Sequence, residues 1–137
     1  MKYLGIDYGT KRVGVAISDE GGILAFPRGV YENSPLLMEK LLHMIHDEHV
    51  EVIVLGESNN YQGKPNPIMK DIHLFRESIE SESGLRVVLE PEVLSSRQAM
   101  HIQGDNDMND ASAAAIVLQG YLDRLNGPRD IDEDELA

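Results

Sequence analysis

The sequence contains no cysteine, no tryptophan and few aromatic residues of any kind (5%). Without cysteine it can form no disulfide bridge, no thiolate nucleophile and no cysteine-ligated zinc site. No stretch approaches the roughly 18 consecutive apolar residues that a membrane-spanning helix needs. The first residues also lack the apolar run and cleavage site of a signal peptide. These absences predict a soluble, cytoplasmic protein with no membrane partner.

Basic residues are also scarce, because 12 Lys and Arg stand against 24 Asp and Glu, a net charge of −12. This balance argues against broad electrostatic binding of nucleic acid. Part of the acidity is local, since the final segment PRDIDEDELA has five acids and one arginine. A polyanionic partner would therefore have to be bound by a small basic patch together with divalent metal ions.

The length of 137 residues, of which 42% are apolar, suits one domain with one core. Three strand-like runs joined by short glycine-bearing links indicate antiparallel hairpins, and helices then alternate with strands. The α/β fold predicted is a five-stranded mixed sheet, three antiparallel strands then two parallel, with helices on both faces. Pro27 indicates an edge position for its strand. We expect strands at 2–8, 12–18, 23–31, 51–55 and 85–89, and helices from 34, at 66–84, near 95–98 and from 109 to 126. We expect residues 1–126 to form the domain and 127–137 a flexible acidic tail.

Asp7 lies at the end of the first buried strand, and a carboxylate there is costly unless it is paired or binds a metal. The glycines at 5, 9 and 14 keep side-chain bulk away from it, which allows close approach by another group. Asp7 could instead cap the turn that follows. We favour a functional site.

Three further acids, Glu57, Glu92 and Asp110, fall near strand ends or a helix start, where sites gather in open α/β sheets. Such a cluster repels itself unless cations lie within it, and ligation by oxygen alone favours Mg²⁺ or Mn²⁺. Two such ions about 3.5–4 Å apart can support phosphodiester hydrolysis. Glu57 and Glu92 could also be solvated acids, and Asp110 could serve only the helix dipole.

Lys11 and Arg12 follow Asp7 on the predicted hairpin turn and could contact substrate phosphate, although a solvated hairpin would show the same residues. His43, His46 and His49 repeat every three residues on the first predicted helix. A metal site there is possible by spacing, but a solvated helix face is the preferred interpretation.

Four segments, in order, resemble the motifs of the YqgF family, described as pre-16S rRNA nucleases and as Holliday-junction-resolvase-like proteins. They cover roughly residues 1–125 and are GIDYGTKRVGVAIS at 5–18, VIVLGESNNYQGKPNP at 52–67, PEVLSSRQA at 91–99 and NDASAAAIVLQGYLD at 109–123. The resemblance implies a ribonuclease H-like fold and a Mg²⁺-dependent nuclease that matures ribosomal RNA ends. It also implies that Asp7, Glu92 and Asp110 are metal ligands and that Asn60 and Gly63 belong to a substrate-facing loop.

The chain departs from this family pattern in two places. Pro91 and Val93 stand where an acid and an arginine usually flank the glutamate, so one expected phosphate contact is missing. The second motif continues with Glu57 in place of an apolar residue, and related junction resolvases of this fold have a catalytic glutamate there. These differences indicate a divergent member with an altered metal site.

Three other functions fit the same residues. One is a dimeric Holliday-junction resolvase acting on branched DNA, and a second is a non-catalytic RNA-binding or ribosome-assembly module. A third follows from the resemblance of GIDYGT to the phosphate-binding hairpin of the actin, sugar-kinase and Hsp70 superfamily, but that reading needs a second domain to close over the nucleotide. The oligomeric state, monomer or homodimer, stays open.

Overall fold

The computed structural model describes residues 1–57, 67–91 and 108–127, with only the backbone described for 108–110. The strands are β1 (Tyr3–Asp7), β2 (Arg12–Ser18), β3 (Ala25–Glu32), β4 (Val52–Glu57) and β5 (Arg86–Pro91). The helices are α1 (Leu37–Glu48), α2 (Met69–Ser83) and α4 (Met108–Asn126). The predicted short helix near 95–98 and the tail from residue 128 lie outside the described residues.

The strands form one mixed sheet in the order β3-β2-β1-β4-β5. The β1–β2 and β2–β3 pairs are antiparallel, whereas β1–β4 and β4–β5 are parallel. The predicted fold class is therefore confirmed, as is the edge position of Pro27 in β3. Beside it the register changes, because Val15 pairs with Gly29 but Ala16 with Pro27, which leaves Arg28 as an extra residue.

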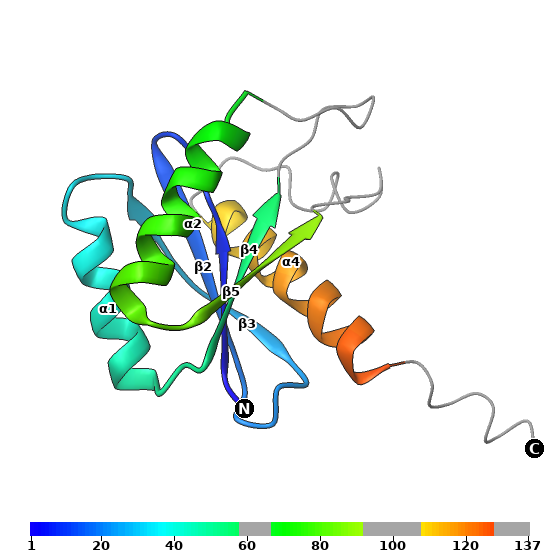
Figure 1. Cartoon of the computed structure of the whole chain (residues 1–137). Coiled ribbons are helices and arrows are strands. Elements are labelled where there is room, and N and C mark those ends of the chain that lie inside the picture. The colour runs from blue at the N-terminus through cyan, green and yellow to red at the C-terminus, as the bar shows by residue number, and fades with distance from the viewer. Residues whose placement is uncertain (58–66, 92–107, 128–137) are drawn as a thin grey trace, which may run out of the picture.

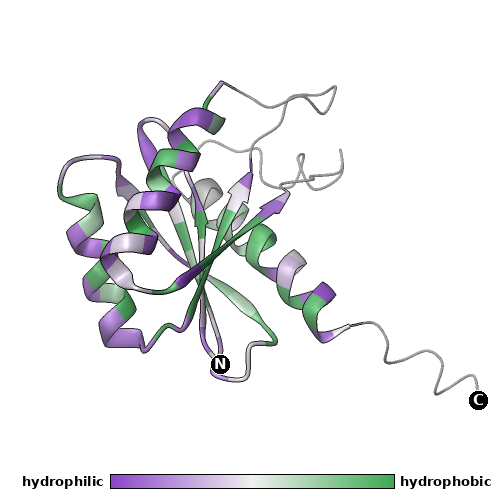
Figure 2. Cartoon of the chain, viewed as in Figure 1, coloured by the Kyte–Doolittle hydropathy of each residue, from purple (hydrophilic) through white to green (hydrophobic). Residues whose placement is uncertain are grey.

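Helices cover both faces of the sheet, α1 and α2 on one and α4 on the other (Figure 1). Strand alternation supplies a separate apolar core to each face. Leu4, Ile6, Ile53 and Leu55 pack with the apolar sides of α1 and α2, whereas Tyr3, Ala16, Val52 and Val54 pack with Ala114, Val117, Leu118 and Leu122 of α4. Figure 2 shows α1 and α2 with hydrophilic residues on the side that faces away from the sheet.

Several boundaries differ from prediction. β4 and β5 each run two residues past their predicted ends, because Gly56 pairs with Glu90 and Glu57 with Pro91. This pairing overrides the poor strand preferences of glycine, glutamate and proline. α1 begins at Leu37, after a turn in which the Ser34 hydroxyl accepts the N–H of Leu36 at 3.2 Å.

The apolar face of α4 is fully buried at Ala111, Ala114, Leu118 and Leu122. Leu125, in the last turn, is 52% exposed although it follows the same helical spacing. Asn126, one residue further on, donates from Nδ2 to the Gly22 oxygen in the β2–β3 connection, so the last turn of α4 is held there by polar contacts. None of the described helices has the length and apolarity to cross a membrane.

Candidate active site

Asp7 is the last residue of β1, the central strand of the sheet, and its side chain is half-buried. On one side it pairs with Gly14 of β2. On the other side, the pairing of Ile6 with Leu55 makes Gly56 of β4 its next neighbour. Both of the residues that lie beside Asp7 in the adjacent strands are therefore glycines.

The side chain of Asp7 belongs to the α4 face of the sheet. Leu4 and Ile6 pack against α1 and α2, so Tyr3, Gly5 and Asp7 alternate to the other side. Gly5 confirms this direction, because a Cβ added there would lie 2.7 Å from the Cβ of Leu118 in α4. Asp7 is thus a charged residue at the end of β1, on the side of the sheet that α4 covers.

The turn after Asp7 is tightly folded. A Cβ added at Gly9 would overlap the carbonyl oxygen of Arg12, so only glycine fits this position of the β1–β2 turn. Lys11 and Arg12, the predicted phosphate contacts, are both exposed at the end of this hairpin. The structure therefore places an exposed basic pair within a few residues of Asp7.

Glu57 lies at the same edge of the sheet but on the opposite face. Leu55 packs against α1 and α2, and a Cβ on Gly56 would meet Val117 of α4 at 3.3 Å. Glu57 is still within the ladder, paired with Pro91, so its side chain alternates back to the α1 and α2 face. The sheet thus separates the predicted pair Asp7 and Glu57.

Two other predicted ligands are described only in part or not at all. Asp110 lies in the first turn of α4, where its backbone alone is described. Glu92, Asn60 and Gly63 lie outside the described residues. Within the described part of the chain, no group of three or more His, Asp or Glu side chains could hold a metal ion.

A buried acid that the sequence did not suggest is Glu90, next to the predicted Glu92. Its side chain is only 4% exposed and forms an ion pair with Arg124 of α4. Gly120, one turn before Arg124, makes room for it, since a Cβ there would lie 3.5 Å from Glu90 Oε2. The hydrogen bond to Glu90 raises the pKa of Arg124 above its ordinary value. Leu89 packs on the α1 and α2 side of the sheet, so strand alternation directs the next residue, Glu90, to the α4 side. This alternation is the sequence signal that could have identified Glu90 as a buried acid.

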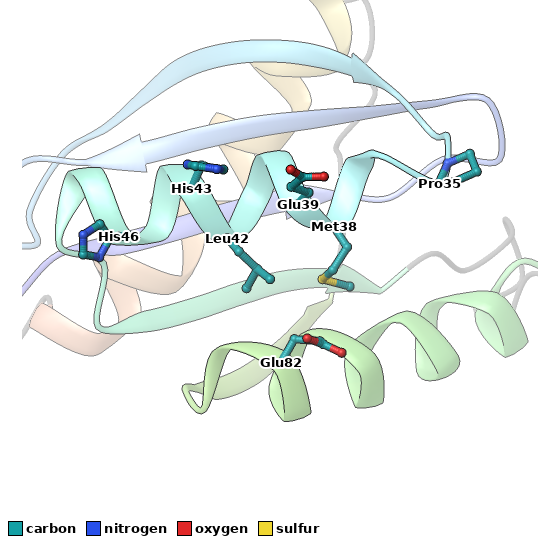
Figure 3. Close-up of a pocket in the computed structure, with 7 residues that line it drawn as sticks. All are labelled: Pro35, Met38, Glu39, Leu42, His43, His46 and Glu82. Carbon is teal, nitrogen blue, oxygen red and sulfur yellow. The ribbon is translucent and has the colours of Figure 1, made fainter.

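A surface groove of about 530 Å³ lies between α1 and α2 (Figure 3). Met38 and Leu42 form its apolar part, and His43 and His46 lie on α1, with Glu82 on α2 across from them. Both histidines are exposed. His49 ends the helix in the left-handed conformation, with φ of 58°. The preferred interpretation of a solvated helix face fits this arrangement.

The chain is similar in sequence to known proteins. Residues 1–124 match the model of the family RuvX, described as "Holliday junction resolvase". A protein of Nitratidesulfovibrio vulgaris named "Putative pre-16S rRNA nuclease" is 36% identical over 126 residues, which cover 90% of this chain and 85% of that protein. A protein of the same name from Geobacillus sp. is 34% identical over 90% of this chain and 98% of its own length.

Solved structures show the same fold. RuvC of T. thermophilus in complex with a Holliday junction substrate has a TM-score of 0.62 at 20% identity and covers 93% of this chain and 97% of its own. The Fowlpox virus resolvase in complex with Holliday junction DNA has a TM-score of 0.60 at 14% identity and covers 93% of this chain and all of its own. At sequence identities this low, these structures show only that the fold is shared.

Proposed function

The chain belongs to the RuvX (YqgF) family of nucleases, and from this premise we propose that it is a divalent-metal-dependent nuclease that processes the ends of pre-16S rRNA. The observation that carries the proposal is the placement of Asp7. It ends the central strand between two glycines and faces the helix whose first turn contains Asp110. The curated relatives named for pre-16S rRNA support this substrate.

Backbone geometry supports Asp110 as the partner of Asp7. α4 runs antiparallel to β1, because Tyr121 contacts the ring of Tyr3 and both Ala114 and Leu118 lie next to Gly5. From Gly5 to Asp7 a strand rises about 6.6 Å, which equals roughly four residues of helix. Moving four residues back along α4 from Leu118 and Ala114 reaches Ala114 and Asp110, so Asp110 lies at the end of the α4 segment that is level with Asp7.

We propose that Asp7, Glu92 and Asp110 hold the metal ion. The set offers only carboxylate oxygens, the ligands that Mg²⁺ and Mn²⁺ prefer. Glycine beside Asp7 leaves room for an ion. A bound divalent ion would activate water and stabilise the leaving oxygen. β5 ends at Pro91, at the same sheet edge as Asp7, and Glu92 is the next residue in the sequence.

The chain's own basic residues would orient the substrate. Lys11 and Arg12 are exposed at the β1–β2 hairpin, so they can contact a backbone phosphate of the RNA substrate when the substrate is bound at Asp7. We propose Asn60 and Gly63, in the segment of the sequence that follows β4, as further substrate contacts. Since the net charge is −12, this local contact, together with the metal, would supply the attraction for RNA.

A Holliday-junction resolvase is the second candidate, and the description of the matching family favours it. Cleaving a four-way junction symmetrically needs two active sites and thus a dimer, whereas trimming an RNA end can use a monomer. The two candidates share the same residues and the same metal chemistry, so the substrate has to distinguish them.

The proposed function is tested with a 16S rRNA precursor and a four-way DNA junction, each labelled at one end and incubated with the protein in Mg²⁺. We expect cleavage of the precursor near its mature ends, and none in EDTA. Cleavage of the junction without cleavage of the precursor would instead favour a Holliday-junction resolvase. Binding of RNA without cleavage in either Mg²⁺ or Mn²⁺ would contradict a nuclease and favour a ribosome-assembly module.

Glu57→Gln provides a second test, because the sheet separates Glu57 from Asp7. We expect the variant to keep the cleavage rate and the metal requirement of the unchanged protein within about twofold. The change is isosteric and removes only the charge. The measurement is the initial rate as a function of Mg²⁺ concentration. A loss of a hundredfold or more would instead assign Glu57 to the metal site, as the sequence first suggested.

A further inference from the structure

Asn33 ties the segment after β3 to the turn that follows Asp7. Its side-chain amide donates from Nδ2 to the carbonyl oxygen of Gly9 at 2.8 Å. Its backbone N–H donates to the carbonyl oxygen of Lys11 at 2.9 Å. One half-buried residue, distant in sequence, therefore holds two carbonyls of the β1–β2 turn.

This turn lies outside the strand ladder. The β1–β2 ladder ends at the Asp7 and Gly14 pair, and the residues between Asp7 and Arg12 belong to neither strand. Gly9 has no side chain to hold it and is the position where a Cβ would overlap the Arg12 carbonyl. A glycine in a tight turn has wide conformational freedom when its contacts are removed.

We propose that Asn33 is a positioning residue, which fixes the β1–β2 turn so that Asp7, Lys11 and Arg12 keep their places in the metal and phosphate site. The inference rests on the proposed function, since it assigns Asn33 to that same site. Asn33 acts through Gly9 and Lys11 and touches neither metal nor substrate. Groups that orient metal ligands in this indirect way typically change metal affinity or activity by about 10–100-fold when they are replaced.

The test uses Asn33→Leu, which keeps the size of the side chain and removes the amide donor without adding charge. Asn126→Leu is the matched control. Asn126 also donates from Nδ2 to a glycine carbonyl, that of Gly22 at 2.9 Å, but in the connection before β3. Asn33→Leu loses the side-chain hydrogen bond to Gly9, whereas Asn126→Leu loses two, since Asn126 Nδ2 also donates to the carbonyl oxygen of Leu122 at 2.8 Å, so the control removes at least as much hydrogen bonding at a different turn. Thermal unfolding measures the structural cost of each.

The decisive readout is Mn²⁺ binding by calorimetry, followed by kcat and KM of cleavage. We expect Asn33→Leu to bind Mn²⁺ about 10–100-fold more weakly than Asn126→Leu, with a matching fall in kcat. Equal Mn²⁺ affinity in the two variants, at similar stability, would overturn the proposal. If Asn33→Leu does not fold, Asn33→Ser replaces it, because its short hydroxyl cannot span to Gly9.

Failure of this inference and failure of the proposed function give different results. Hydrogen exchange of the backbone amide of residue 33, which donates to the Lys11 carbonyl, needs neither metal nor substrate. It should be faster in Asn33→Leu than in Asn126→Leu, and unchanged exchange would overturn the role of Asn33 in the turn. A protein that binds Mn²⁺ in this Asn33-dependent way but cleaves no nucleic acid would instead refute the nuclease proposal alone.

Discussion

Replacing Asp7 with asparagine should reduce metal-dependent cleavage by about a thousandfold, the loss expected when several kcal/mol of metal-assisted stabilisation disappear. Asparagine has the same shape, so the strand and its glycine neighbours stay as they are. It keeps one oxygen but loses the negative charge that favours a divalent ion. The rate is measured on the labelled precursor in saturating Mg²⁺.

The control for Asp7→Asn is Asp19→Asn, a change of the same chemistry in the connection between β2 and β3. Asp19 accepts the N–H groups of Ile23 and Leu24 at 2.8 and 3.0 Å, and these bonds hold the pKa of its carboxyl below the usual value. We expect this variant to cleave at the normal rate. Equal activity of Asp7→Asn and the unchanged protein would remove Asp7 from the site.

The second large effect is expected for Gly5→Ala. The new Cβ would lie 2.7 Å from the Cβ of Leu118 and 3.2 Å from the carbonyl oxygen of Ala114, so α4 would have to move away from the sheet. Such overpacking typically costs about 1–3 kcal/mol. Since α4 contains Asp110, we also expect cleavage to fall at temperatures where the protein is still folded. Denaturant unfolding and the cleavage rate measure the two effects.

Gly29→Ala is the control for this substitution. Gly29 lies in the edge strand β3, and its added Cβ would first meet the hydroxyl end of Tyr31 at 3.3 Å, a side chain that can move aside. We expect its stability to change by no more than about 0.5 kcal/mol. If Gly5→Ala were equally neutral in both stability and rate, close packing of α4 on β1 could not be what places Asp110.

The fold and the position of Asp7 could be predicted because both depend on local patterns. The glycine-bearing links indicated hairpins, Pro27 indicated the edge, and a carboxylate after a buried strand indicated a site. Gly84, the last residue of the helix predicted at 66–84, ends α2 in the left-handed conformation with φ of 75°. Each of these signals acts within a few residues, so the sequence alone carries it.

The sequence alone was a poorer guide to which face of the sheet each acidic side chain lies on. The sequence suggested a strand ending at Leu55 and so left Glu57 free to turn toward Asp7. Pairing with Pro91 extends β4, and this extension places Glu57 on the opposite face. The burial of Glu90 depends on Gly120 and Arg124 of a distant helix. Register between strands and helix packing are long-range properties that one strand's own residues do not reveal.

The claim that Asp7 anchors a metal site on the α4 face is tested most directly by a crystal structure of the protein grown with Mn²⁺, with the ion located by its anomalous scattering. We expect a Mn²⁺ peak in direct contact with an Asp7 carboxylate oxygen, on the side of the sheet that α4 covers and within reach of Asp110. A Mn²⁺ ion bound to Glu57 on the α1 and α2 face, with none at Asp7, would contradict the claim.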